Sequence, residues 1–354
     1  MKRYLPTFVI AIALLSLGVA CATGRAPAKP SLAIKPLPGS DTVPVPLDEL
    51  GTGTYRSIEG GLYPGGVNLP PADHDAAGIA RRNLVRALDV NGLASATGRY
   101  VLMSIGAADA SAGWCSRSSA PPCDSWSFTG RAVADTGVNH GQLVIVNGAM
   151  PGSGFEMWSK PGSTNYNRIR DTRLAPLGLS EKQVQVVWMS IPDTGAAFPI
   201  LALPSDARVR LQHFGETIRA LKTRYPNLQL LFISSGVYGG YSAGREPDGY
   251  ESGFVVKWVI ESQISQRRDR PPTAEVGDLR HSPGSDPWVA WGPYPWTRGG
   301  SQKRDGLVWL RSDFDSTGTE LSQTGESKLG LLLFEFFRTS PYTRCWLAAA
   351  GVCG

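Results

Sequence analysis

The segment Tyr100–Gly113 joins an apolar run to a loop that can carry chemistry. Its sequence, YVLMSIGAADASAG, changes at Gly106 from apolar residues to small and polar ones. Ligands of open α/β sheets bind just beyond the carboxyl ends of the strands, so a nucleophilic serine would suit this loop. The chain has Ala107, Ala108 and Asp109 there instead. The segment therefore predicts either an active site or one that has lost its nucleophile.

Alternating helices and strands are predicted to position this loop. Hydrophobic periodicity and capping residues predict strands at 99–105, 142–147, 184–191 and 228–235, and helices at 74–89, 206–224, 253–264 and 324–338. The last helix is apolar on all sides in its C-terminal half, which predicts deep burial. The segment 106–130 is rich in Gly, Ser and Pro and predicts a loop, whereas WVAWG and LVWL are short strand-like runs.

Continuous apolar strands separated by helices predict a mainly parallel sheet that is covered on both faces. The fold class is therefore a three-layer α/β/α domain, which we place at residues 56–354, with no internal repeat. Residues 22–55 contain Pro27, Pro30, Pro36, Pro38, Pro44 and Pro46. This composition favours extended polyproline II and predicts a tether.

Residues 1–21 have the composition of an export signal. Lys2 and Arg3 precede the run FVIAIALLSLGVA, which is shorter than the roughly 20 apolar residues of a membrane-spanning helix. The GVAC sequence ending at Cys21 is similar to a bacterial lipobox, in which the cysteine is lipidated and anchors the protein to the membrane. The alternative is cleavage after Ala22, which would leave a soluble secreted or periplasmic protein.

The cysteines fit an exported protein with one cysteine reserved for lipid. The chain has five cysteines. Cys115 and Cys123 are eight residues apart, and so are Cys345 and Cys353. Pairing within each couple leaves Cys21 free, although four cysteines allow three connectivities.

The amount and the distribution of charge argue against nucleic-acid binding. The formal net charge is +5 and falls to +3 when Lys2 and Arg3 leave with the signal. The remaining basic residues are scattered, which argues against nucleic-acid binding. We predict no metal and no cofactor, and the oligomeric state is left open.

Several longer motifs carry a family resemblance. They are GLYPGGVN (61–68), YVLMSIG (100–106), QLVIVNGAMPG (142–152), VQVVWMS (184–190), YESGFVVKW (250–258), PWVAWGPYPW (287–296), DGLVWLRSDF (305–314) and TGTELSQTGESK (317–328). In this order they resemble the SGNH, or GDSL-type, hydrolase superfamily, and within it a group of exported bacterial proteins. The resemblance implies a flavodoxin-like three-layer fold and an ancestry in ester hydrolysis.

The resemblance also implies where catalytic residues should stand. The serine position falls on Ala108, and the oxyanion-binding glycine on Gly148. The oxyanion-binding asparagine position falls near Asp193, whose carboxylate would repel an oxyanion. The Asp-x-x-His positions fall on Thr317 and Glu320. The resemblance therefore implies that the nucleophile, the base and the residue that orients the base are all replaced.

Two serines near Ala108 and the four histidines are candidates to replace the missing catalytic residues. Ser104 lies within a predicted strand, and Ser111 lies three residues beyond Ala108 on the same loop. The four histidines, His74, His140, His213 and His281, have the sequence surroundings of structural residues. A hidden serine–histidine pair is therefore the minor interpretation, because a serine needs a base within hydrogen-bond reach.

Asp109, Asp193 and Glu320 replace or adjoin polar positions of the implied site. These carboxylates, with Ser111, are candidates for binding a cation or sugar hydroxyls, and a glycosidase-like acid–base pair is a further alternative. The simplest interpretation is that they face solvent. The aromatic runs such as WVAWGPYPW can likewise form a sugar-stacking wall, but packing is the simpler prediction.

Together these features predict an exported, lipid-anchored protein of SGNH type. The leading function is a non-catalytic cell-envelope protein that keeps a pocket for a carbohydrate or ester-bearing ligand. The alternatives are an active carbohydrate or lipid esterase with a rearranged site, and a structural component of the envelope.

The lipobox-like sequence yields a direct test. Cys21→Ser removes the sulfur that would carry the lipid, so the protein should move from the membrane fraction to the soluble fraction of fractionated cells. If the wild-type protein is already soluble in the periplasm or the medium, Cys21 is not an anchor.

Overall fold

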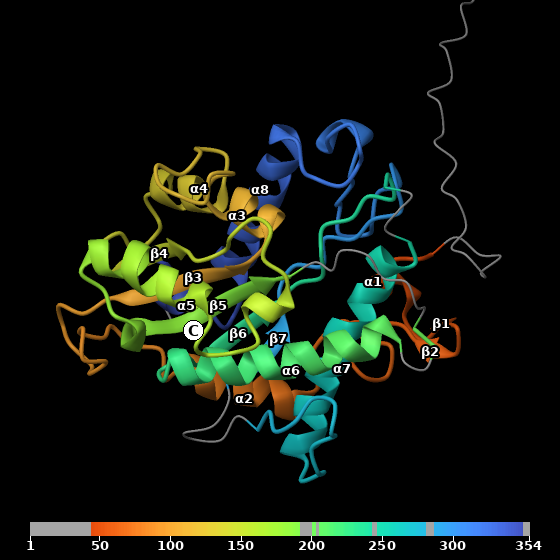
Figure 1. Cartoon of the computed structure of the whole chain (residues 1–354), viewed down its shortest axis with the longest axis horizontal. Helices are drawn as coiled ribbons and strands as arrows, with labels where there is room; N and C mark the ends of the chain where they lie inside the picture. Colours follow the sequence, from red (N-terminus) through yellow and green to blue (C-terminus); the bar gives the residue numbers. More distant parts are fainter. Residues whose placement is uncertain (1–43, 192–199, 203–204, 243–245, 281–286, 350–354) are drawn as a thin grey trace, which may run out of the picture. The chain divides into compact units, whose positions relative to one another are not determined.

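The computed structural model of the chain describes residues 44–191, 200–202, 205–242, 246–280 and 287–349 (Figure 1). The predicted export signal, most of the predicted tether, Asp193 and Cys353 lie outside these residues. Within them, no helix is both long enough and apolar enough to cross a bilayer.

A five-stranded sheet forms the centre of the domain. Its strands are β3 (Tyr100–Gly106), β4 (Leu143–Asn147), β5 (Val184–Ser190), β6 (Leu230–Ile233) and β7 (Trp288–Trp291). They lie in the order β4-β3-β5-β6-β7, and every neighbouring pair is parallel. This is the flavodoxin-like order, in which the first strand of the sheet has the second on one side and the third on the other. The predicted α/β fold class, with a mainly parallel sheet of flavodoxin-like order, is confirmed.

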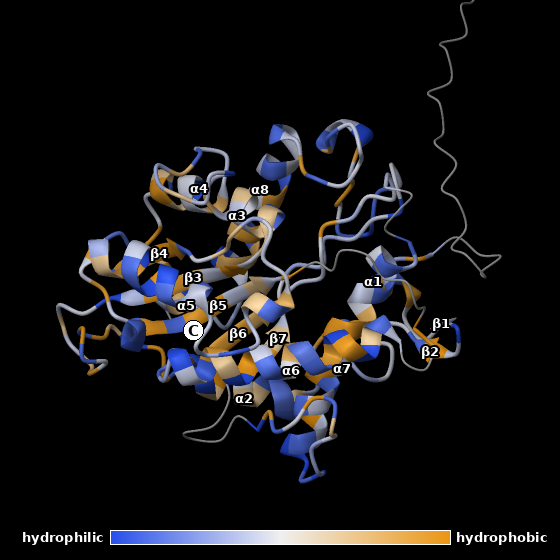
Figure 2. Cartoon of the chain, in the orientation of Figure 1, coloured by the Kyte–Doolittle hydropathy of each residue, from blue (hydrophilic) through white to orange (hydrophobic). Residues whose placement is uncertain are grey.

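Helices cover both faces of the sheet because its strands are apolar on both faces. Met103 and Val187 belong to the core under one face, and Leu102 and Trp188 to the core under the other. Figure 1 shows α6 and α7 side by side, with α3, α4 and α8 grouped elsewhere around the sheet. The helices are α1 (Leu47–Leu50), α2 (Ala72–Arg82), α3 (Ala108–Trp114), α4 (Phe128–Ala134), α5 (Thr164–Ile169), α6 (Asp206–Arg224), α7 (Asp248–Arg267), α8 (Gln323–Thr339) and α9 (Arg344–Leu347). Figure 2 shows hydrophobic residues along the strands and hydrophilic ones on α5.

The long helices agree with the sequence. Helix α6 has the predicted bounds, and its first turn is capped by Ser205, whose hydroxyl accepts a hydrogen bond from the backbone N–H of Arg208. Helix α7 is longer at both ends than predicted. Helix α8 forms as predicted, but its C-terminal half is not buried on all sides, because Leu331 is 45% exposed.

The predicted helix 74–89 ends early, at Arg82. The following backbone is held by a side chain from β5: the amide of Gln185 accepts from the N–H of Arg86 at 2.9 Å and donates to its carbonyl at 2.6 Å. These bonds satisfy backbone groups that a helix would otherwise pair internally. The helical periodicity of the sequence is therefore overridden by a tertiary contact.

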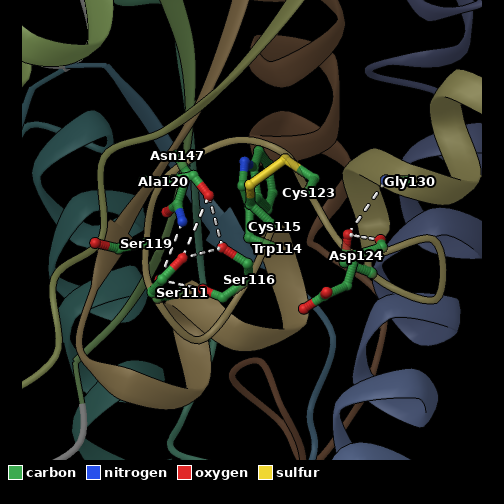
Figure 3. The surroundings of a disulfide bond; sticks show 12 residues. Ser111, Trp114, Cys115, Ser116, Ser119, Ala120, Cys123, Asp124, Gly130 and Asn147 are labelled. Atoms are coloured by element: carbon green, nitrogen blue, oxygen red, sulfur yellow. Dashed lines mark hydrogen bonds between the residues drawn. A yellow bond between two sulfur atoms is a disulfide. The ribbon is translucent and has the colours of Figure 1, made fainter.

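The predicted loop 106–130 is only partly a loop, since it contains α3 and the start of α4. Helix α3 is held by Trp114, which is fully buried and stacks on Trp188 at 5.5 Å between ring centroids. The predicted disulfide Cys115–Cys123 is present at the end of α3 (Figure 3). The LVWL run forms no strand, and its Trp309 is buried with its indole N–H donating to the carbonyl of Pro295.

The folded domain begins before residue 56. Leu47 is fully buried, and the hydroxyl of Tyr55 donates to the carboxylate of Glu251 on α7 at 2.9 Å. Asp48 forms an ion pair with the buried Lys303 at 2.8 Å. A short hairpin, β1 (Thr54–Tyr55) and β2 (Ile58–Glu59), follows. Residues 44–55, the last part of the predicted tether, therefore pack against the domain.

Buried charges gather at the start of α7. Arg210 of α6 forms an ion pair with Asp248, and both are buried. Burial raises the pKa of the nearby Glu246 to about 7, an effect that Asp248 and Glu251 reinforce and a hydrogen bond with Tyr238 opposes. The folded protein therefore holds a proton on Glu246 at mildly acidic pH that the unfolded chain releases.

This proton makes stability depend on pH. Between the ordinary carboxyl pKa and about 7, the folded state binds more protons than the unfolded state, so the free energy of unfolding should fall as pH rises through this window. Glu246→Gln removes the cost of ionising the buried group. The free energy of unfolding of this variant, relative to that of the wild type, should therefore be roughly 3 kcal/mol larger at pH 8 than at pH 4.5. Urea unfolding at several pH values measures this difference.

Asp73→Asn is the matched control. A hydrogen bond from Arg268 is the largest cause that lowers the pKa of Asp73, to about 2, which lies below the window. This variant should leave the slope of stability between pH 5 and pH 7 unchanged. A Glu246→Gln variant with the wild-type slope would show that Glu246 ionises normally in the folded protein.

Candidate functional site

The candidate site begins where β3 ends. Gly106 has φ = +151°, and a Cβ at this position would lie 2.1 Å from the carbonyl oxygen of Ser190 on β5. Only glycine fits so close to a neighbouring backbone. Beyond it the chain turns directly into α3, so that Ala107 and Ala108 occupy the first positions past the strand.

A cavity of about 350 Å³ opens at this point. Four parts of the chain form its wall: the β3–α3 turn, the segment after β4, the first turns of α6 and the loop before α8. The lining residues are Ala107, Ala108, Asp109, Gly152, Ser153, Gly154, Phe155, Glu156, Asp206, Val209, Arg210, His213 and Glu320. The cavity lies beside β3, which has β4 on one side and β5 on the other. This is the topological switch point of the sheet, where ligands bind in open α/β folds.

Acidic side chains dominate the lining. Asp109, Glu156, Asp206 and Glu320 contribute carboxylates, against the cations Arg210 and, when protonated, His213. Arg210 is already paired with Asp248. The cavity is therefore net negative and suited to ligands that donate hydrogen bonds or carry positive charge.

Asp109 and Glu320, two of the three carboxylates that are candidates for a shared site, both line this cavity. Asp109 is only 7% exposed, and its carboxylate accepts a 3.4 Å hydrogen bond from the N–H of Leu321. Glu320 is exposed. The bond to Leu321 ties the loop that carries Glu320 to the start of α3.

Arg117 also holds this loop in place. It donates to the carbonyl of Leu321 and, at 2.8 Å from Nε, to the carboxylate of Glu326 at the start of α8. The hydrogen bond with Glu326 raises the pKa of Arg117, with Glu320 and Asp109 as nearby charges. Arg117 belongs to the loop closed by the Cys115–Cys123 disulfide, so the disulfide loop supports one wall of the cavity.

The other positions implied by the resemblance do not line the cavity. Thr317 is exposed, and its hydroxyl donates to Asp315 at 2.8 Å. Gly148 is buried behind the wall, where its carbonyl accepts from Arg168 at 2.6 Å. A Cβ at Gly148 would lie 2.5 Å from the carbonyl of Ser104, which explains the glycine by packing. Asp193 lies outside the described residues.

Ser104 and Ser111 are not among the residues that line the cavity. Both are fully buried. Ser104 donates to the side-chain oxygen of Asn147 at 2.9 Å, and Ser111 donates to the carbonyl of Ser116 while it accepts from Asn147. Figure 3 shows the Ser111 hydroxyl between Asn147 and Ser116, engaged in a buried network.

Several lining residues were not recognised in the sequence. Ser153 and Glu156 follow β4, and Asp206 and His213 lie in the first turns of α6. His213 had the sequence surroundings of a structural residue, but it faces the cavity and stacks on Phe155 at 5.9 Å between centroids. The sequence does contain a signal for the residues on α6. A helix that follows a strand of a parallel sheet begins at the edge where the strands have their carboxyl ends, so its first turns lie close to the site.

The aromatic runs do not form a stacking wall. Trp288, Trp291 and Trp296 are all buried in the two cores, which confirms the packing interpretation. As to metals, no group of three or more His, Cys, Asp or Glu side chains in the described ranges is arranged to hold an ion.

Comparisons with known proteins give only distant structural similarities. No protein-family model matches the chain, and no curated protein matches it. A lipase/acylhydrolase from Enterococcus faecalis is 13% identical with a TM-score of 0.32, over 67% of this chain and 94% of that chain. A Slackia heliotrinireducens protein with the provisional name SGNH hydrolase is 11% identical with a TM-score of 0.31, over 68% of this chain and 99% of that chain.

A carbohydrate esterase family 2 enzyme with a carbohydrate binding domain, from Corynascus thermopiles, is 11% identical with a TM-score of 0.35, over 69% of this chain and 67% of that chain. These names belong to the class of protein that the sequence resembles. TM-scores of about 0.3 are too low for these similarities to assign an activity to this chain.

Proposed function

We propose that this protein is a non-catalytic binding protein that uses a hydrolase-like fold to hold a hydroxyl-rich ligand, such as a carbohydrate. The observation that carries the proposal is the cavity at the switch point, where Ala107 and Ala108 occupy the turn after β3 and carboxylates surround it. An alanine at this turn has no oxygen to attack an ester carbonyl.

The lining suits hydroxyl groups. A carboxylate accepts two hydrogen bonds in its plane, so Asp109, Glu156, Asp206 and Glu320 offer paired acceptors to neighbouring hydroxyls. Hydrogen bonds to charged groups contribute about 1.5–3 kcal/mol each, twice the value of neutral ones. Phe155 adds an apolar contact to this polar wall, as is usual in ligand sites.

The proposal includes export and lipid anchoring through Cys21. Support comes from the positively charged start, the short apolar run and the lipobox-like GVAC of the sequence. A cell-envelope location would bring the cavity close to envelope polysaccharides.

One observation favours an active ester hydrolase as the second candidate. Ser153 lines the cavity with His213, and His213 Nδ1 lies 3.4 Å from a carboxylate oxygen of Glu216. A histidine oriented by a carboxylate is the arrangement that activates a serine. However, the one hydrogen bond of the Ser153 hydroxyl among the described contacts is with Asn165, at 2.9 Å.

Hydrolysis and labelling separate the two candidates. The wild-type protein should not hydrolyse short-chain aryl esters above the uncatalysed rate, and a serine-directed phosphonate should not label it. The reason is that the turn after β3 lacks a nucleophile and that no described histidine is hydrogen-bonded to Ser153. A phosphonate adduct on Ser153 that is lost in Ser153→Ala and reduced in His213→Gln would contradict the binding-protein proposal and support the esterase.

Ligand binding tests the proposal itself. In calorimetric titrations with neutral glucose, mannose and N-acetylglucosamine trisaccharides, at least one should bind saturably. Glu320→Gln and Glu156→Gln should each weaken that binding by about tenfold, because the amide keeps the shape but loses the charge-assisted hydrogen bond.

Glu335→Gln is the matched control, since Glu335 lies on α8, pairs with Arg338 and does not line the cavity. Its affinity should equal that of the wild type. If no trisaccharide binds, or if all three variants bind equally well, the cavity is not a carbohydrate site.

A further inference from the structure

Two neighbouring arginines, close to the segment that follows β4, have no acidic partner among the residues that the structure describes. Arg168 is on α5, and Arg173 is in the single wide turn Arg170–Leu174 that continues it. Arg168 donates from Nη2 to the carbonyls of Gly148 and Ala149, at 2.6 and 3.5 Å. The two guanidinium groups are near enough that the charge of Arg173 helps to lower the pKa of Arg168.

Several of their N–H groups have no acceptor. The Nε and Nη1 atoms of Arg168 and the Nε atom of Arg173 are buried, and none has a hydrogen-bond partner among the described residues. Arg173 Nη2 makes one long bond, 3.4 Å to the hydroxyl of Ser119. Within the same part of the chain, neither arginine forms an ion pair. Each buried donor without a partner carries a desolvation cost.

Two neighbouring arginines have acidic partners, in contrast to Arg168 and Arg173. Arg170 lies between the two and pairs with Asp171 at 2.7 Å. Arg224, at the end of α6, pairs with Glu181. Burial, and then the charge of Arg173, lower the pKa of Arg168 to about 10. Arg168 therefore remains charged at neutral pH despite the repulsion from Arg173.

We propose that Arg168 and Arg173 form a binding site for a phosphate-type oxyanion, with the hydroxyl of Ser119 as a further donor. A guanidinium group presents planar, paired N–H donors that match two oxygens of such an anion. Both arginines are only partly buried, so an anion bound at their accessible N–H groups would offset the repulsion between them. Figure 3 shows the Ser119 side chain pointing away from the disulfide, so its hydroxyl is not used there.

An anion bound at this site would also stabilise the cavity wall formed by the segment after β4. Arg168 binds the carbonyl of Gly148, and Asn165 on the same helix donates to Ser153 in the cavity wall. Anion binding would thus stabilise the helix that holds the segment after β4. The inference does not rest on the proposed ligand of the cavity, because the two sites use different residues.

Thermal unfolding of the full chain in inorganic phosphate tests the site. At constant ionic strength set with chloride, phosphate should raise the Tm of the wild-type protein saturably, by roughly 5 °C at saturation. In Arg173→Gln the phosphate needed for half of this effect should increase at least tenfold. No rise in wild-type Tm, or an equal rise with chloride alone, would overturn the proposal.

Arg170→Gln is the control, because it removes one positive charge from the same turn but leaves the pair intact. It should respond to phosphate as the wild type does. In chloride alone, Arg173→Gln should have a Tm no lower than that of the wild type, since it relieves the repulsion. Equal loss of the phosphate response in both variants would mean a general charge effect and no site.

Vesicles distinguish the two sources of the phosphoryl group. In a Cys21→Ser background, which removes the proposed lipid, the protein is sedimented with phosphatidylcholine vesicles with and without phosphatidylglycerol. Binding to the anionic vesicles that Arg173→Gln abolishes and Arg170→Gln retains assigns the site to a lipid headgroup. Phosphate-dependent stabilisation without vesicle binding assigns it to a small soluble anion.

Discussion

The close approach of Gly106 to the backbone of β5 is the constraint on which the site depends. A side chain at this position would collide with the carbonyl of Ser190, so β3 can pair with β5 to its last residue only because residue 106 is glycine. The same residue, at positive φ, turns the chain into α3. The positions of Ala107, Ala108 and Asp109 at the mouth of the cavity follow from this one contact.

The segment after β4 separates two regions of opposite charge. The cavity on one side is lined by four carboxylates, and on the other side the partly buried Arg168, with Arg173 nearby, donates to the carbonyl of Gly148. The arginines do not neutralise the carboxylates, because Arg168 is occupied by backbone carbonyls and Arg173 reaches toward Ser119. Partly buried charges that do not pair with one another carry a desolvation cost in each of the two regions. A ligand bound to each region, as we propose, would offset this cost.

The sequence predicted the regular parts of the fold well for a physical reason. Strands such as Val184–Ser190 and helices such as Asp206–Arg224 have hydrophobic periods and caps that span their whole length, so local residues are enough to specify them. The predicted helix 74–89 failed at its C-terminal part, where Gln185, far away in sequence, binds the backbone of Arg86. Segment 106–130 failed because burial of Trp114, which sequence composition does not reveal, stabilises α3.

For the site, the sequence by itself determined residue identities: Ala108 stands where the family resemblance expects a serine, and Thr317 and Glu320 stand where it expects the acid and the base. Residue identity is a local fact and needs no structure. Only the tertiary structure decided which residues share the cavity. It brought Asp109 and Glu320 together with Glu156, Asp206 and His213 from separate parts of the chain, and it buried Ser104 and Ser111 away from it. That outcome depends on how strands and helices pack across long sequence separations, which no short motif encodes.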